Sequence, residues 1–124
     1  MVSKRSRDTE VFLPLTPAMF HVLLALADGE KHGYAILKEV LQRTGGKVRL
    51  SAGTLYGIIR RLLAEGQVVE SDERPDAALD DERRRYYRLT DFGRRVAVAE
   101  AERLESMLGM ARAKKLLRRP AMGS

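Results

Sequence analysis

The stretch SAGTLYGIIRRLLAEG, residues 51–66, decides how the rest of the chain is interpreted. Its apolar residues recur at helical spacing, and Ser51 and Gly66 stand where a helix cap and a helix stop are expected. On a helical wheel the apolar side chains share one side: Leu55, Ile58, Ile59, Leu62 and Leu63. The opposite side holds Gly53, Gly57, Arg60 and Ala64. The stretch therefore predicts a helix with one apolar face and one nearly bare face.

The two glycines of the bare face need an explanation. Within a helix each costs ~1 kcal/mol relative to alanine. Because glycine has no side chain, it allows another molecule to come close to the helix backbone. A structural alternative is that Gly53 relieves crowding near the cap and that Gly57 packs against a neighbouring helix.

Duplex DNA is the molecule that fits this helix best. A helix in the major groove brings its N-terminal residues nearest the base edges, and here those residues are small or hydroxylated. The two arginines lie about two turns further on, where phosphate contacts are expected. The residues of this helix predicted to contact DNA are Ser51, Gly53, Thr54, Tyr56, Gly57, Arg60 and Arg61.

The flanking sequence predicts the elements around this helix. A first helix begins at Thr16-Pro17 and ends at Gly29, and a second runs from His32-Gly33 to Gly45-Gly46. Residues 47–50 alternate polar and apolar, which indicates a short strand.

Residues 68–70 and 83–89 predict a β-hairpin, and a last helix is expected over 91–118, about 42 Å long at ~1.5 Å per residue. Three helices followed by a hairpin are typical of a winged helix-turn-helix, in which the hairpin is the wing.

The expected fold class is thus mainly α with a small β-hairpin: a winged helix-turn-helix domain plus a long C-terminal dimerisation helix. The boundaries are a basic N-terminal arm at 1–12, the winged domain at 13–90, the dimerisation helix at 91–118 and a tail at 119–124. A helix this long leaves apolar surface that a second copy would cover. The residues assigned to dimerisation are Val96, Leu104, Met107, Leu108 and Ala111. The alternative is that this helix folds back on the first helix.

The wing adds three arginines to the predicted DNA site, Arg83, Arg84 and Arg85, as backbone phosphate contacts. The alternative is that they solvate an edge strand and pair with the acidic tip, residues 72–82, which holds six acids and one arginine, a local charge of −5. One of the two tyrosines that follow, Tyr86 or Tyr87, is expected to pack on the core.

Composition narrows the function classes. The 124-residue chain carries a net charge of +6, so the sequence outside the acidic tip carries about +11, which favours a polyanionic partner. It has no cysteine, its two histidines lack metal-ligand spacing, and no catalytic motif is found. We therefore expect no enzyme activity, no cofactor and no metal. No secretory signal or membrane span is recognised, and a cytoplasmic protein is expected.

Several segments resemble PadR-type transcriptional regulators, in the expected order over roughly residues 13–95. The most specific is Ser51-Ala-Gly-Thr-Leu-Tyr56, followed by Ile59, Arg61, Leu62 and Glu65-Gly66. Supporting segments are Leu15-Thr-Pro17, Leu26-Ala-Asp-Gly29, His32-Gly33-Tyr34 and Arg85-Tyr-Tyr-Arg-Leu-Thr90 with Gly93. The resemblance implies a homodimeric winged-helix repressor, bound to double-stranded operator DNA and often released by a small molecule.

The single C-terminal helix is similar to that of the smaller PadR subgroup. Some members of that subgroup hold flat hydrophobic molecules in a dimer-interface pocket walled by tryptophans, but this chain has no Trp. Phe12, Phe20 and Phe92 could take the place of the tryptophans around a small hydrophobic effector. The simpler interpretation is that these three phenylalanines only pack in the core. The functional alternative to the regulator is a winged-helix module that binds another protein and no DNA.

Overall fold

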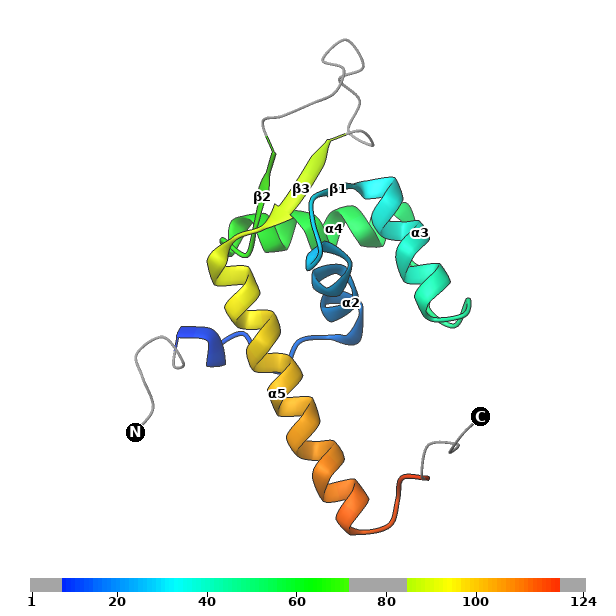
Figure 1. Ribbon diagram of the computed structural model, residues 1–124. Helices are drawn as coiled ribbons and strands as arrows, with labels where there is room; N and C mark the ends of the chain where they lie inside the picture. Colours follow the sequence, from blue (N-terminus) through cyan, green and yellow to red (C-terminus); the bar gives the residue numbers. More distant parts are fainter. Residues whose placement is uncertain (1–7, 72–84, 119–124) are drawn as a thin grey trace.

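The computed structural model describes residues 8–71 and 85–118. After a short helical turn at residues 8–10, the elements in chain order are α2 (Pro17–Leu26), β1 (Lys31–His32), α3 (Gly33–Arg43), α4 (Ala52–Ala64), β2 (Val68–Glu70), β3 (Tyr86–Leu89) and α5 (Asp91–Ala113). Three helices pack beside a small sheet, and α5 leaves this body as a long single helix (Figure 1). The predicted fold class, a mainly helical winged helix with a C-terminal helix, is confirmed.

Each main helix begins at a side-chain cap. The caps are Thr16, His32, Ser51 and Thr90, and each side chain accepts a hydrogen bond from the backbone N–H three residues further on. Glycines with positive φ follow α2, α3 and α4, as expected for stops that need the left-handed region: Gly29, Gly45, Gly46 and Gly66. The predicted limits of these three helices are therefore confirmed.

The last helix is shorter than the sequence predicts. It ends at Ala113 rather than near 118, so its 23 residues span about 34 Å rather than 42 Å. Lys115 has a φ of 63°, and the N–H of Leu116 donates to the carbonyl of Ala111 at 2.8 Å. This is a left-handed helix stop, and no glycine marks it because Lys115 adopts that conformation itself.

The sheet also differs from expectation, since it has three strands in the order β1-β3-β2. The strand predicted at 47–50 is wrong: Val48 donates its N–H to Thr44 Oγ1 (3.0 Å), which holds this segment against the end of α3. The third strand is Lys31–His32, which pairs antiparallel with Tyr86 and Tyr87 of β3. Two residues are too few for a visible alternation, so periodicity could not find it.

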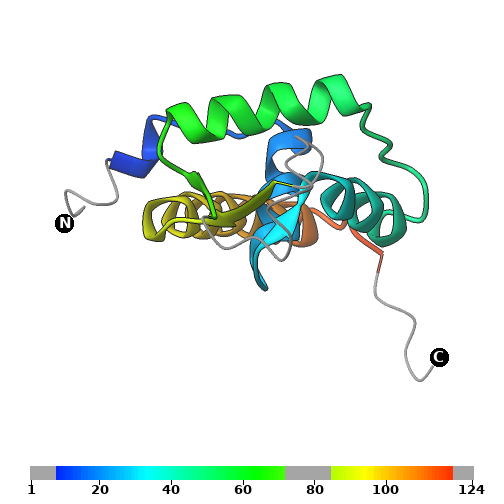
Figure 2. The same cartoon turned by 90° about the horizontal axis from the view of Figure 1, so that it is seen from above.

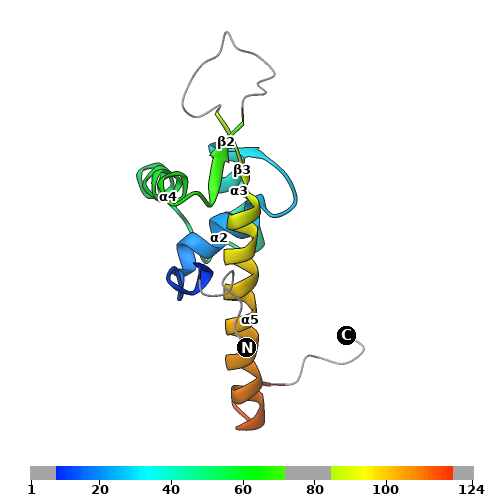
Figure 3. The same ribbon diagram turned by 90° about the vertical axis from the view of Figure 1, so that its left-hand side faces the viewer.

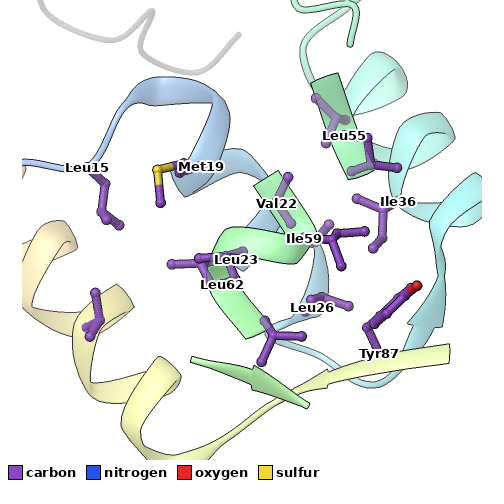
Figure 4. Packing of buried hydrophobic residues seen from close by; sticks show 14 residues of the cluster. Leu15, Met19, Val22, Leu23, Leu26, Ile36, Leu55, Ile59, Leu62 and Tyr87 are labelled. Carbon is purple, nitrogen blue, oxygen red and sulfur yellow. The ribbon is translucent and has the colours of Figure 1, made fainter. Parts of the chain in front are cut away.

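The core lies where α2, α4 and the sheet meet (Figure 4). It is made of Leu15, Met19, Val22, Leu23, Ala25, Leu26, Ile36, Val40, Leu55, Ile59, Leu62, Val68, Tyr87 and Val96. Tyr87 is the tyrosine that packs inward, whereas Tyr86 is half-buried with its ring edge-on to His32 at 5.5 Å. The expectation of one core tyrosine is confirmed.

The end of the predicted N-terminal arm is anchored to this body. Phe12 packs edge-on against Phe92 of α5, with ring centroids 5.6 Å apart, and Thr9 is buried. Phe20 also packs partly buried on the core, so all three phenylalanines are core aromatics. The rest of the arm and the predicted tail lie outside the described residues.

Candidate nucleic-acid interface

Helix α4 lies along one edge of the molecule with one side turned outward (Figure 2) and stands apart beside the sheet when seen end-on (Figure 3). Its inward side is formed by Leu55, Ile59 and Leu62, each at most 1% exposed. The exposed residues at its cap, first turn and second half are Ser51, Ala52, Gly53, Thr54, Arg60, Arg61 and Ala64. The apolar and bare faces of the wheel thus lie where the sequence predicts.

The two glycines of the outward face have no packing role within the described chain. A Cβ added at Gly53 would meet no atom within 4 Å, and one added at Gly57 would meet only Arg60 Nη2, at 3.9 Å. Neither has a positive φ, so their backbone conformation does not require glycine either. The structural alternative, crowding at the cap and helix packing at Gly57, is therefore not supported. The bare face is thus the outward side of α4, which carries Gly53, Gly57, Arg60 and Ala64, together with Ser51 and Thr54 at its N-terminal end.

The N-terminal end of the bare face is ordered by its own hydroxyl groups. Ser51 Oγ accepts the N–H of Thr54 at 3.1 Å and donates to Thr54 Oγ1 at 2.9 Å. Both side chains are exposed. The pair presents fixed oxygen atoms at the position from which a recognition helix approaches base edges.

Tyr56 is held by the second helix rather than directed only outward. It is half-buried, and a Cβ at Gly33 would lie 2.9 Å from Tyr56 Cζ and closer still to its hydroxyl. Any side chain at the first position of α3 would require this ring to move. Among the predicted DNA-contacting residues, Tyr56 is thus also a packing contact between α3 and α4.

The two arginines of α4 differ in their surroundings. Arg61 Nε lies 3.0 Å from Glu65 Oε2, one turn further along the helix. Arg60 forms no ion pair within residues 8–71 and 85–118, and its guanidinium lies beside Gly57. Arg60 therefore offers an uncompensated charge to a phosphate, whereas Arg61 is tethered.

Sequence reasoning missed two cations next to α4. Lys47 and Arg49 are exposed in the connection that leads into the helix cap. We predicted that residues 47–50 form a half-buried strand and therefore did not consider these cations as DNA contacts. Only the positive charge of the segment could have indicated that role. Arg88 is a further exposed cation, on the outward side of β3.

The wing is only partly described. Arg85 is about half exposed, and its Nε lies 3.7 Å from Glu70 Oε1 on the neighbouring strand. This partner lies on β2 and not in the acidic tip that the structural alternative named, so the pairing expected by that alternative stays a prediction. Arg83, Arg84 and the acidic tip at 72–82 lie outside the described residues.

The residues assigned to dimerisation fall into two groups. Val96 is fully buried in the core of its own protomer, so it is not available to a second copy, and the assignment of Val96 is corrected here. Further along α5, Met107 and Leu108 are 52% and 46% exposed, while Leu104 and Ala111 are half-buried. The reason is that the inward stripe of α5 meets the core only along its first turns, and the helix then continues past the body (Figure 1).

An ion pair lies on α5 close to the point where the helix leaves the body, and it joins a buried carboxylate to a half-buried arginine. Arg103 donates to both carboxylate oxygens of Glu100, at 2.7 and 2.9 Å, and Glu100 is only 2% exposed. The hydrogen bonds to Glu100 raise the pKa of Arg103 above its ordinary value. Among residues 8–71 and 85–118, none of the helices has the length and hydropathy of a transmembrane span, and His, Asp and Glu side chains form no cluster that could hold a metal ion.

Fold and surface together define a winged-helix protein whose third helix exposes a bare, basic side. The sequence matches the transcriptional regulator PadR-like family over residues 22–99, and the chain belongs to that family. It is 40% identical to Transcriptional regulator Rv3488 of Mycobacterium tuberculosis over 87 residues, which cover 70% of this chain and 75% of that protein.

Solved structures share the fold. A transcriptional regulator from Clostridium thermocellum superposes with a TM-score of 0.59 at 22% identity, covering 94% of this chain and all of that one. Bacillus subtilis PadR in complex with operator DNA superposes with a TM-score of 0.55 at 19% identity, covering 90% of this chain and 53% of that one. At these identities the likeness concerns the fold alone.

Proposed function

We propose that this protein is a dimeric transcriptional repressor that binds a palindromic operator through α4. The observation that carries the proposal is the bare face. A Cβ at exposed Gly53 would meet nothing within 4 Å, and one at half-buried Gly57 would meet only Arg60 Nη2. Each glycine lowers the stability of the helix by ~1 kcal/mol relative to alanine, and neither forms an internal contact that requires a glycine. The glycines are useful only if another molecule comes close to the helix backbone. A major groove about 12 Å wide admits such a helix.

Charge supports DNA as the partner. Arg60, Lys47 and Arg49 are exposed around α4, and none of them forms an ion pair with the described residues. Cations at both ends of a groove-bound helix would contact the phosphates that border the groove. Membership of the PadR-like family and the operator complex of the Bacillus relative support the same partner.

The dimer in this proposal forms through the second half of α5. Met107, Leu108 and Met110 are each about half exposed or more, on a helix that extends away from the body. A two-fold arrangement would place two copies of α4 about 34 Å apart, one helical turn of DNA, which requires a palindromic site.

The proposal includes a repressor role and release from DNA by a small hydrophobic effector, because the resemblance to PadR-type regulators implies both. Without tryptophan, such an effector would need another apolar wall. Phe12 and Phe92 already contact each other. The exposed methionines of α5 are adaptable side chains that could form that wall between two protomers.

The test is selection of duplexes from a random DNA pool by the full chain, followed by titration of the selected duplex and a scrambled one. We expect a preference of at least about a thousandfold at physiological salt and a steep loss of affinity with added salt. Arg60→Ala should weaken binding to both duplexes and reduce the salt slope by about one. Equal, weak affinity for both duplexes would contradict the proposal and favour the protein-binding module.

A further inference from the structure

A continuous chain of contacts runs from Arg61 on α4 to the first turn of α5. Arg61 Nε donates to Glu65 Oε2 at 3.0 Å, and the other oxygen of that carboxylate, Oε1, accepts from Gln67 Nε2 at 2.9 Å. The carboxylate is thus held from both sides, by a cation that faces outward and by an amide that lies inside.

Gln67 provides the fixed end of this chain. Its side chain is fully buried, and its backbone carbonyl accepts the N–H of Thr90, the cap of α5, at 3.1 Å. Thr90 Oγ1 also donates to the carbonyl of Gly66 at 2.6 Å. Gly93 lies so close that a Cβ there would be 2.7 Å from the Gln67 carbonyl carbon. The residues that follow α4 therefore contact the start of α5 directly, through two hydrogen bonds and the close approach of Gly93.

Two features distinguish this arrangement from an ordinary surface ion pair. An exposed pair one helical turn apart usually contributes little, because both side chains remain mobile. Here the Glu65 side chain is only 21% exposed and is fixed by a buried amide. In addition, Gln67 Oε1 is buried without a hydrogen-bond partner in the described structure, a cost that an apolar side chain of the same size would avoid.

We propose that Glu65 and Gln67 are positioning residues that hold the Arg61 guanidinium in one orientation for operator DNA and tie that orientation to α5. This inference rests on the proposed function. Arg61 would then fix the register and orientation of α4 at one phosphate, so that the N-terminal end of α4 meets the correct base edges. Arg60, which has no such tether, would contribute to affinity for any duplex.

The experiment is a double-mutant cycle on the selected and scrambled duplexes. Glu65→Gln keeps the shape of the side chain but replaces one carboxylate oxygen by an NH2 group, which cannot accept. Because Arg61 and Gln67 donate to different oxygens, only one of the two hydrogen bonds is kept in this geometry. We expect Glu65→Gln to raise affinity for the scrambled duplex, because a negative charge near DNA is lost. The ratio of selected to scrambled affinity should fall about threefold or more.

The two adjacent arginines supply the matched control. In the Arg61→Ala background, Glu65→Gln should no longer change the ratio, whereas in the Arg60→Ala background it should change it as in the wild type. Gln67→Met, of similar length without the donor, should lower the ratio as Glu65→Gln does and add little to it. Both affinities in a ratio are measured with the same protein preparation. An unfolded fraction therefore changes both by the same factor and leaves the ratio unchanged.

The outcomes separate this inference from the proposed function. If the wild type prefers the selected duplex but Glu65→Gln changes both affinities equally, or acts alike in both arginine backgrounds, the positioning role is refuted and the regulator stands. If the wild type shows no preference for the selected duplex, both proposals fail together.

Discussion

At the scale of single residues, Gly57 shows most clearly how function and stability diverge. Its position on α4 has room for a side chain, since only Arg60 Nη2 comes within 4 Å of an added Cβ. Alanine there should therefore restore helix propensity without a clash. Under the proposed function, a glycine at this position lets DNA come close to the backbone of α4.

We predict that Gly57→Ala raises the free energy of unfolding by about 0.5–1 kcal/mol, because alanine favours the helix. Gly57→Leu should lower operator affinity at least about tenfold without loss of stability, because a large side chain keeps the helix out of the groove. Urea unfolding and duplex titration measure the two effects. Gly109 of α5, exposed with no atom within 4 Å, gives the control: Gly109→Leu should leave DNA affinity unchanged.

Asp28 gives a prediction about pH. The hydrogen bond from Lys31, together with the lysine's positive charge, lowers the pKa of Asp28 below its ordinary value of 3.8. A lowered pKa means that the ionised form stabilises the fold above pH 3.8, and that this contribution is lost as pH falls through the folded-state pKa. Asp28→Asn should thus be less stable than the wild type at pH 6, and the gap in urea midpoint should close toward pH 2–3. A gap that is constant with pH would contradict this.

The inward and outward positions on α4 could be predicted because they follow from the spacing of residues within that single helix. The outward position of Arg60 and the inward position of Leu62 follow from spacing alone. The contact between Tyr56 and Gly33 could not be predicted, because it depends on how α3 and α4 pack, which no local pattern encodes.

At the scale of elements, caps and stops were the most predictable features. The hydroxyls of Thr16, Ser51 and Thr90 satisfy N–H groups that a helix start leaves unpaired, a local requirement that the sequence displays directly. Strand β1 was missed because a strand of two residues exists only through its partner β3. The end of α5 was missed because Lys115 adopts a left-handed conformation that glycine usually signals.

Gly93 tests the junction between α4 and α5. We predict that Gly93→Ala lowers the free energy of unfolding by about 1–3 kcal/mol or more, because its Cβ would overlap the Gln67 carbonyl and force α5 away. Urea unfolding measures this. Gly109→Ala in the same helix should instead stabilise, and equal effects of the two changes would show that the close contact is absent.

At the scale of the whole molecule, the second half of α5 exposes apolar side chains on a helix that extends away from the body. We predict that Leu108→Glu yields a folded monomer, since Leu108 is 46% exposed and outside the core, and that it loses operator affinity with the dimer. Light scattering after gel filtration measures the mass. Ser106→Glu adds the same charge on another side of α5 and should remain dimeric. A dimer in both variants would refute this interface.

The central claim is that the bare face of α4 lies in a groove of operator DNA. Because the chain has no cysteine, a single one introduced by Lys47→Cys, which lies beside the cap of α4 and outside the bare face, can carry an iron chelate that cuts nearby DNA. The prediction is cleavage confined to the selected site in both half-sites, and none from a chelate placed by Glu102→Cys on α5. Absence of cleavage from position 47 while the labelled protein remains bound to the duplex would contradict the claim.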